Sequence, residues 1–443
     1  MDKLVQQHTD TKAWHLSNFD RFASQLNGSS TTPFHEIRKN ALSKFSELGF
    51  PTTRNEEWKY TNVAPIASQT FKLAAGGMNL DKKILPAYTF GDMPQNLLVF
   101  VNGRFIKEWS CIPAQPKGLV IDSLAHALNR GDAAAQQYLA QYADFENEPF
   151  TALNTAFTHE GVFVRVPAGT VLSEPIHILN LSAESQSPWL THPRNLIVIG
   201  AASSVQIVES YHALSEHVYF NNVVSEIVVE ADALVEHVRI QNESKKAYHI
   251  AWREVHQSRG SKYSSISIDL GGALVRNNFN VRLNALNCEG NLWGFYMASG
   301  GQHIDNHTLI DHAMPHCQSN EHYKGILADK AHCVFNGKVM VHRDAQKTNA
   351  YQKNQCLLLS DEAVINSKPQ LEIFADDVKC SHGASIGQLD DEALFYLRSR
   401  GIGEAEANSM LRHAYAGDIL NHITLEPVRD RLNEMVHAGF AKA

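Results

Sequence analysis

Apolar side chains recur at helical spacing near both ends of the chain. At the start, one stripe covers residues 14–26 and a second covers residues 34–48, which predicts two amphipathic helices. Thr32 and Pro33 give the second helix a start signal, because Pro is tolerated at the first helical position. Gly49 follows as an end signal.

Three further helices are predicted at the end of the chain. The acidic run 390–392 precedes an apolar segment that ends at Arg400, and acidic side chains favour the N-terminal end of a helix. Two glycines then end this helix. The remaining helices are expected at residues 404–421 and 426–440. We interpret the three together as a cap on the preceding region or as a docking platform for a partner.

The middle of the chain has a different pattern, in which apolar and polar residues alternate over short runs. Clear runs lie at residues 204–208, 226–229, 235–240, 265–268, 279–283 and 338–341. Small or acidic residues separate the runs, at residues 231–233, 271–273, 289–291, 329–331, 361–363 and 375–377. Many short strands with turn signals every ~8–12 residues predict an all-β fold. A sandwich, a propeller and a β-helix all fit that description.

Two features favour the parallel β-helix. The turns share a small or acidic residue before a resumed apolar run, as stacked coils of a solenoid would show. Hairpin signals are scarce, and Asn102-Gly103 and Asn336-Gly337 are the clear cases. No fixed repeat period is evident. We therefore expect a helical region over residues 1–95, a parallel β-helix over 96–385 and a helical domain over 386–443.

Charge and composition exclude several classes of function. The net charge of −8 disfavours nucleic-acid binding, which needs a positive surface. The first residues carry no secretory signal, and no apolar run reaches the ~18 residues of a membrane span. We therefore expect a cytoplasmic protein that binds neither nucleic acid nor membrane.

The six cysteines form no C-x-x-C pair; they stand at positions 111, 288, 317, 333, 356 and 380. This spacing argues against a zinc ribbon or a cluster bound by this chain alone. The sequence also lacks a phosphate-binding loop, a G-x-G-x-x-G turn and a G-x-S-x-G elbow. We expect a non-catalytic protein that does not hydrolyse ATP.

Cys380 and His382 form the most specific candidate site in the sequence. Residues two apart on a strand point to the same side, so a thiol and an imidazole would share one small volume. Both suit iron, and a thiolate can carry sulfane sulfur as a persulfide. In the other interpretation, Cys380 faces the core together with Val378, as free cysteines usually do. His382, beside Gly383, is better placed for exposure.

Residues 368–389 and 395–402 closely resemble the C-terminal signature of the SufB/SufD family of iron–sulfur cluster assembly proteins. Residues 54–61, which form a polar loop or short helix, resemble the N-terminal signature of the SufD branch. Residues 323–326 and 334–337 also look typical of the family. The missing C-x-x-C-type segment favours the SufD branch over SufB.

The resemblance implies a right-handed parallel β-helix that pairs with SufB and docks the ABC-type ATPase SufC through its C-terminal helices. It implies a scaffold role, with a nascent iron–sulfur cluster at the SufB interface, His382 as a ligand and Cys380 as a nearby contributor. The predicted partner-binding residues are Phe395, Tyr396, Leu397, Arg398 and Arg400. The family is also linked to a reduced flavin, for which no motif is evident here. A homodimer in the absence of SufB is left open.

Two other functions remain as alternatives. Parallel β-helices often host carbohydrate-active enzymes, although a fold alone does not decide function. An independent metal-binding protein is the other alternative, because metal-ligating residue types are dense in one stretch. That stretch holds His303, His307, Asp311, His312, His316, Cys317 and His322. Its spacings match no defined metal motif.

Overall fold

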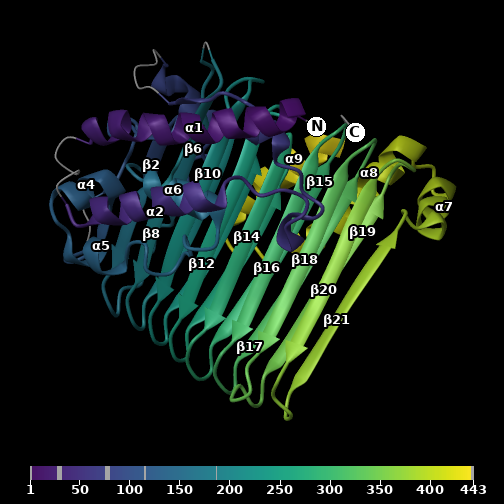
Figure 1. Cartoon of the computed structure of the whole chain (residues 1–443). Helices are drawn as coiled ribbons and strands as arrows, with labels where there is room; N and C mark the ends of the chain where they lie inside the picture. The colour runs from purple at the N-terminus through teal and green to yellow at the C-terminus, as the bar shows by residue number, and fades with distance from the viewer. Residues whose placement is uncertain (1, 27–31, 75–79, 114–115, 186, 441–443) are drawn as a thin grey trace.

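The computed structural model describes residues 2–26, 32–74, 80–113, 116–185 and 187–440. Its body is a β-solenoid of about eight turns, with helices from both ends of the chain packed on it (Figure 1). This confirms the predicted mainly-β fold with a β-helix and flanking helices. Within the described chain, none of the helices is long and apolar enough to cross a membrane.

Two sheets form the walls of the solenoid. Sheet A runs in the order β4 (Val120–Ser123), β5 (Val162–Val166), β8 (Arg194–Ile199), β10 (Tyr219–Val229), β12 (Tyr248–Gln257), β14 (Leu274–Leu283), β16 (His303–His312), β18 (His332–Val341) and β20 (Val364–Ile373). Sheet B runs in the order β3 (Arg104–Phe105), β2 (Asn96–Val101), β6 (Ile176–Ser182), β9 (Ser204–Ala213), β11 (Leu234–Asn242), β13 (Lys262–Asp269), β15 (Glu289–Ala298), β17 (Gln318–Leu327), β19 (Asn349–Leu358) and β21 (Lys379–Gly387). Off this path, β1 (Lys72–Leu73) pairs with β7 (Trp189–Thr191), which also pairs with β10.

Each full coil contributes one strand to each sheet, and strands of successive coils pair in parallel. Tyr248 pairs with Leu274, 26 positions on, whereas His332 pairs with Val364, 32 positions on. This variation in coil length explains why no fixed period is visible in the sequence. The six alternating runs all lie within strands of 8–11 residues.

Two predicted turn signals are wrong. Residues 289–291 begin β15, because the chain has already turned at Asn287, whose φ is 61°. Asn336-Gly337 lies inside β18, where a Cβ on Gly337 would lie 2.7 Å from the ring of Phe335. Asn102-Gly103 does form the expected antiparallel hairpin, between β2 and β3.

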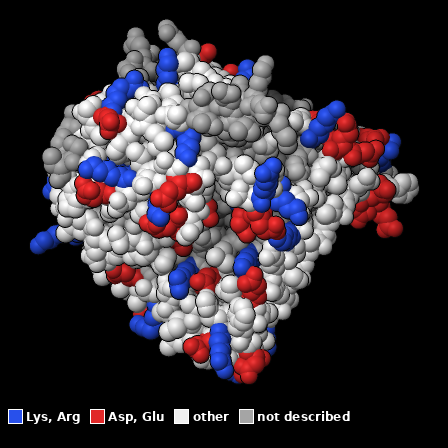
Figure 2. All heavy atoms as spheres, in the orientation of Figure 1, with Lys and Arg blue, Asp and Glu red and all other residues white. Residues whose placement is uncertain are grey.

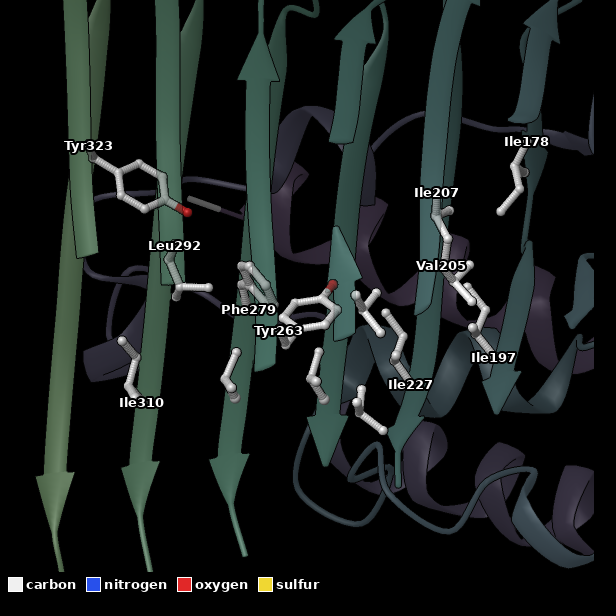
Figure 3. Packing of buried hydrophobic residues seen from close by; sticks show 14 of the residues in the cluster. Ile178, Ile197, Val205, Ile207, Ile227, Tyr263, Phe279, Leu292, Ile310 and Tyr323 are labelled. Carbon is white, nitrogen blue, oxygen red and sulfur yellow. The ribbon is translucent and has the colours of Figure 1, made fainter. Parts of the chain in front are cut away.

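Parallel register stacks inward-facing side chains into columns along the solenoid. Aliphatic residues such as Ile197, Ile227 and Ile207 form the apolar part of this core (Figure 3). Farther along, aromatic rings interlock with glycines on the next coil. The ring of Tyr323 lies 2.2 Å from where a Cβ of Gly294 would stand, so that column has no room for a larger residue.

The N-terminal helices pack along the solenoid, and the segment around η2 reaches β14 and β20 (Figure 1). The bounds of these helices are α1 (Asp2–Ser24), α2 (Phe34–Leu48), η2 (Glu56–Trp58), α3 (Ala64–Ala67), η3 (Lys82–Ala87), α4 (Leu124–Asn129), α5 (Ala133–Tyr138) and α6 (Pro149–Ala156). Both predicted N-terminal helices are confirmed, although Pro33 stands at the N-cap of α2 and not inside it. Phe22, Phe45 and Leu153 join α1, α2 and α6 in one apolar cluster.

The three predicted C-terminal helices are also confirmed, as α7 (Asp391–Ser399), α8 (Glu404–Leu420) and α9 (Glu426–Phe440). Asp390 caps α7 by accepting bonds from the backbone N–H groups of Glu392 and Ala393. Apolar side chains of α8 and α9 pack on the outer face of sheet B, through contacts that include Ile326 and Ile419. These helices therefore cover the side of the solenoid and leave its last coil open, which corrects the interpretation of an end cap.

Candidate functional site

Among the described residues, no strand pairs with the two outer strand edges of the last coil. Strand β20 pairs with β18, and β21 pairs with β19, and each ends its sheet (Figure 1). Apolar side chains are exposed here, and Phe374 and Ile386 are 64% and 52% exposed. An exposed strand edge with apolar neighbours is a template for pairing with another chain.

Cys380 and His382 lie on β21, at the open end. Register places Cys380 beside Ala350 and His382 beside Gln352. Because Ala350 and Gln352 are buried inside the solenoid and β-strand side chains alternate, Cys380 and His382 belong to inward-facing columns that end at the open coil. Cys380 packs beside the small apolar cluster around Ala350 and is half-buried, whereas His382 is exposed.

The thiol of Cys380 is held in its neutral form. Burial raises the pKa of this thiol, against a smaller opposing effect of a hydrogen bond with the backbone of Ala350. Lys379 alternates to the other face of the strand. Within the described ranges, no charged group is among the causes of the shift in the pKa of Cys380, although a nearby cation would favour the thiolate.

Alkylation of the monomeric chain tests this environment. Iodoacetamide is expected to modify exposed Cys111 first and Cys380 more slowly, because Cys380 is half-buried and its pKa is raised. The rate at Cys380 should keep rising at pH values above the ordinary cysteine range. Peptide mass spectrometry over time measures both rates, with Cys111→Ser as the control. Faster modification of Cys380 than of Cys111 would contradict this placement.

The histidine-rich stretch is spread over both sheets. His303 and His307 lie on the outer face of sheet A, whereas His312 is buried inside and contacts Ser319. His322 lies on the outer face of sheet B, where it contacts Gln355. The remaining members of the stretch, Asp311, His316 and Cys317, lie at the turn between the two sheets or beside it. Among the described residues, no three His, Cys, Asp or Glu side chains form a group that could hold a metal ion.

Sequence reasoning missed a contact between two distant segments. The segment around η2 lies on the outer face of sheet A, where Arg276 donates to the carbonyl oxygen of Glu57 at 2.6 Å. The guanidinium of Arg276 lies over the ring of Trp58, 3.9 Å from its centroid. Lys368 on β20 forms an ion pair with Glu56 at 3.1 Å. The two segments that carry the resemblance, residues 54–61 and 368–389, therefore touch.

The predicted partner-binding residues lie on α7 or directly after it. This helix has no buried residue, and Phe395 and Tyr396 are 73% and 57% exposed. The guanidinium of Arg400 lies over the Tyr396 ring, and Arg398 pairs with Glu404. Leu397 is partly buried. Helix α7 projects from the body, and charged side chains gather at that corner (Figure 2).

Comparisons with known proteins give one consistent result. Residues 181–415 match the family described as SUF system FeS cluster assembly, SufBD core domain, and residues 9–178 match the SufBD protein N-terminal region. A SufBD family iron–sulfur cluster assembly protein of Synechocystis is 36% identical over 93% of this chain and 92% of its own. The iron–sulfur cluster assembly protein SufD of Escherichia coli is 28% identical over 88% of this chain and 89% of its own.

Proposed function

We propose, because the chain belongs to the SufBD family of iron–sulfur cluster assembly proteins, that it is a non-catalytic scaffold subunit of a cytoplasmic complex with SufB and SufC. The observation that carries this proposal is the open last coil, where Cys380 and His382 end two inward-facing columns beside unpaired strand edges. The nascent cluster is the cargo of this site.

The open coil of this chain has fewer candidate ligands than an iron–sulfur cluster needs. Iron–sulfur clusters are usually held by four side chains, mostly cysteine thiolates. The open coil offers the exposed imidazole of His382 and the half-buried thiol of Cys380. A second chain must therefore supply the remaining ligands. A SufB solenoid that pairs with β20 and β21 would extend both sheets and bring its own ligands to the junction.

The same edges would allow a homodimer to form in the absence of SufB. Two copies of this chain would then bury the apolar side chains that surround the open coil, such as Phe374 and Ile386. Such a pair would bring two Cys380 and two His382 side chains together, but it would lack the cluster ligands that SufB is proposed to supply.

SufC is proposed to dock on α7. Exposed aromatic and arginine side chains are typical of energetic anchors at protein interfaces, and α7 presents both kinds in Phe395, Tyr396 and Arg400. The ATPase activity would reside in SufC, because this chain has no phosphate-binding loop.

Ile386→Lys tests the pairing through the open coil. Ile386 follows Cys356 in an inward-facing column, so a lysine there would place a charge where the partner solenoid must exclude water. We expect co-expression with SufB and SufC to yield at least tenfold less complex by size exclusion.

The matched control is Val171→Lys, at an equally apolar position that is 74% exposed near the first coils. This control should leave complex recovery unchanged. Full recovery of the complex with Ile386→Lys would show that the partner binds elsewhere.

A further inference from the structure

A cavity of about 380 Å³ lies near the first coils, at the other end of the solenoid from β21. Its walls come from α1, the β2–β3 hairpin, the loop after α6 and the end of β7. Its apolar lining includes Phe22, Leu26, Phe157 and Leu190. This volume and this mixture of apolar walls with a few polar groups are typical of small-molecule sites.

His192 lies in the wall of this cavity. The side-chain amide of Asn222, at 3.2 Å, donates to Nδ1 of His192. Burial holds the pKa of His192 well below its usual value, so the ring is neutral and its proton resides on Nε2. Nε2 has no hydrogen-bond partner in the described part of the chain. Because this atom is fully buried, a molecule in the cavity does not reach it, and His192 forms part of the neutral wall.

Glu160 and Arg104 complete the polar lining. The Oε2 atom of Glu160 also has no hydrogen-bond partner within the described ranges. Burial raises the pKa of Glu160 to about 7, and Asp122 adds to this rise, while Arg104 and the N–H of Gly161 oppose it. Arg104 is itself exposed on β3.

We propose that this cavity binds a small molecule that joins a carboxylate to an apolar body. The guanidinium of Arg104 is the donor for the carboxylate. The apolar body would pack against the side chains of α1 and Phe157. This site is independent of the cluster-assembly proposal, because it uses none of the residues of the open coil.

Glu160 makes the binding dependent on pH. A bound carboxylate repels an ionised Glu160 but accepts a hydrogen bond from a protonated one, so binding is coupled to proton uptake. The other titratable groups that line the cavity, His159 and His192, are kept neutral, because burial lowers the pKa of each ring. Affinity should therefore fall as the pH rises through 7, by about tenfold between pH 6 and pH 8.

Calorimetric titration of the full chain with sodium octanoate tests the proposal, with 1-octanol as the uncharged probe. We expect saturable octanoate binding at pH 6 and binding of 1-octanol that is at least tenfold weaker. Arg104→Gln should weaken octanoate binding at least tenfold, whereas Arg259→Gln, which changes an exposed arginine far along the chain, should leave it unchanged. Glu160→Gln should retain binding and lose the dependence on pH.

Three results would overturn the proposal. They are the absence of saturable octanoate binding at pH 6, equal binding by Arg104→Gln and wild type, and equal affinity for octanoate and 1-octanol. Thermal unfolding of each variant shows whether a loss of binding reflects a loss of fold. Because Arg104 is exposed, its variant is expected to unfold at the wild-type temperature.

Discussion

His382→Ala is expected to leave the complex with SufB and SufC intact while removing most of its iron and labile sulfide. The imidazole of His382 is exposed on the edge strand, so its loss leaves no cavity in the core and no buried group unpaired. A cluster that loses one of its ligands becomes exposed to solvent at that iron and is released more readily. We expect at least a tenfold fall in iron and acid-labile sulfide per complex.

The experiment is co-expression of the three proteins, size exclusion of the complex and chemical analysis of iron and sulfide. His342→Ala is the matched control, because His342 is also exposed and its contact with Asp311 lies outside the open coil. Cys380→Ser is a second variant, and it separates the contribution of the thiol from that of the imidazole. Wild-type cluster content in an intact His382→Ala complex would show that His382 is not a ligand.

The sequence predicted the strands and helices better than it predicted their assembly. Alternation identified runs within β9, β10, β11, β13, β14 and β18, and helical spacing identified α7 to α9, because each pattern reflects a single buried face. Coil boundaries were harder to find. A solenoid turn needs only one residue of positive φ, as at Asn287 or Asp232, and such positions accept several residue types.

In the histidine-rich stretch, strand alternation determines which side chains lie on the same face. His303 and His307 are four positions apart and share a face, whereas His312 is an odd number of positions from His307 and faces inward. His322 lies on the next strand, in the other sheet. Once strand bounds are known, the alternation of side chains excludes one shared site.

Strand alternation predicted the placement of Cys380 and His382 only in part. Their spacing of two predicted a shared face, and the register with Ala350 and Gln352 identifies that face as the interior. The sequence predicted that the strands end near residue 385, and β21 is the last strand of its sheet. It could not show whether the C-terminal helices leave this strand uncovered. Exposure of His382 follows from the uncovered position of β21, not from any residue near it.

Glu226→Ala is expected to destabilise the fold by ~3–5 kcal/mol, the usual cost of leaving a buried charge unpaired. The carboxylate of Glu226 is fully buried in β10 and pairs with the fully buried guanidinium of Arg194 at 2.7 Å. It also accepts hydrogen bonds from the backbone N–H groups of Ala140, Tyr142 and Ala143. The side chain of Glu226 therefore links the segment after α5 to the solenoid.

Chemical denaturation at pH 7 measures this cost, with Glu362→Ala as the matched control. The ion pair of Glu362 with Lys330 is exposed on both sides, so its loss should change the free energy of unfolding little. Adding Arg194→Met to Glu226→Ala should recover part of the lost stability, because it removes the unpaired charge. Recovery should stay incomplete, since three backbone N–H groups remain without their acceptor. Equal stability of Glu226→Ala and Glu362→Ala would mean that water reaches Arg194 and replaces the carboxylate.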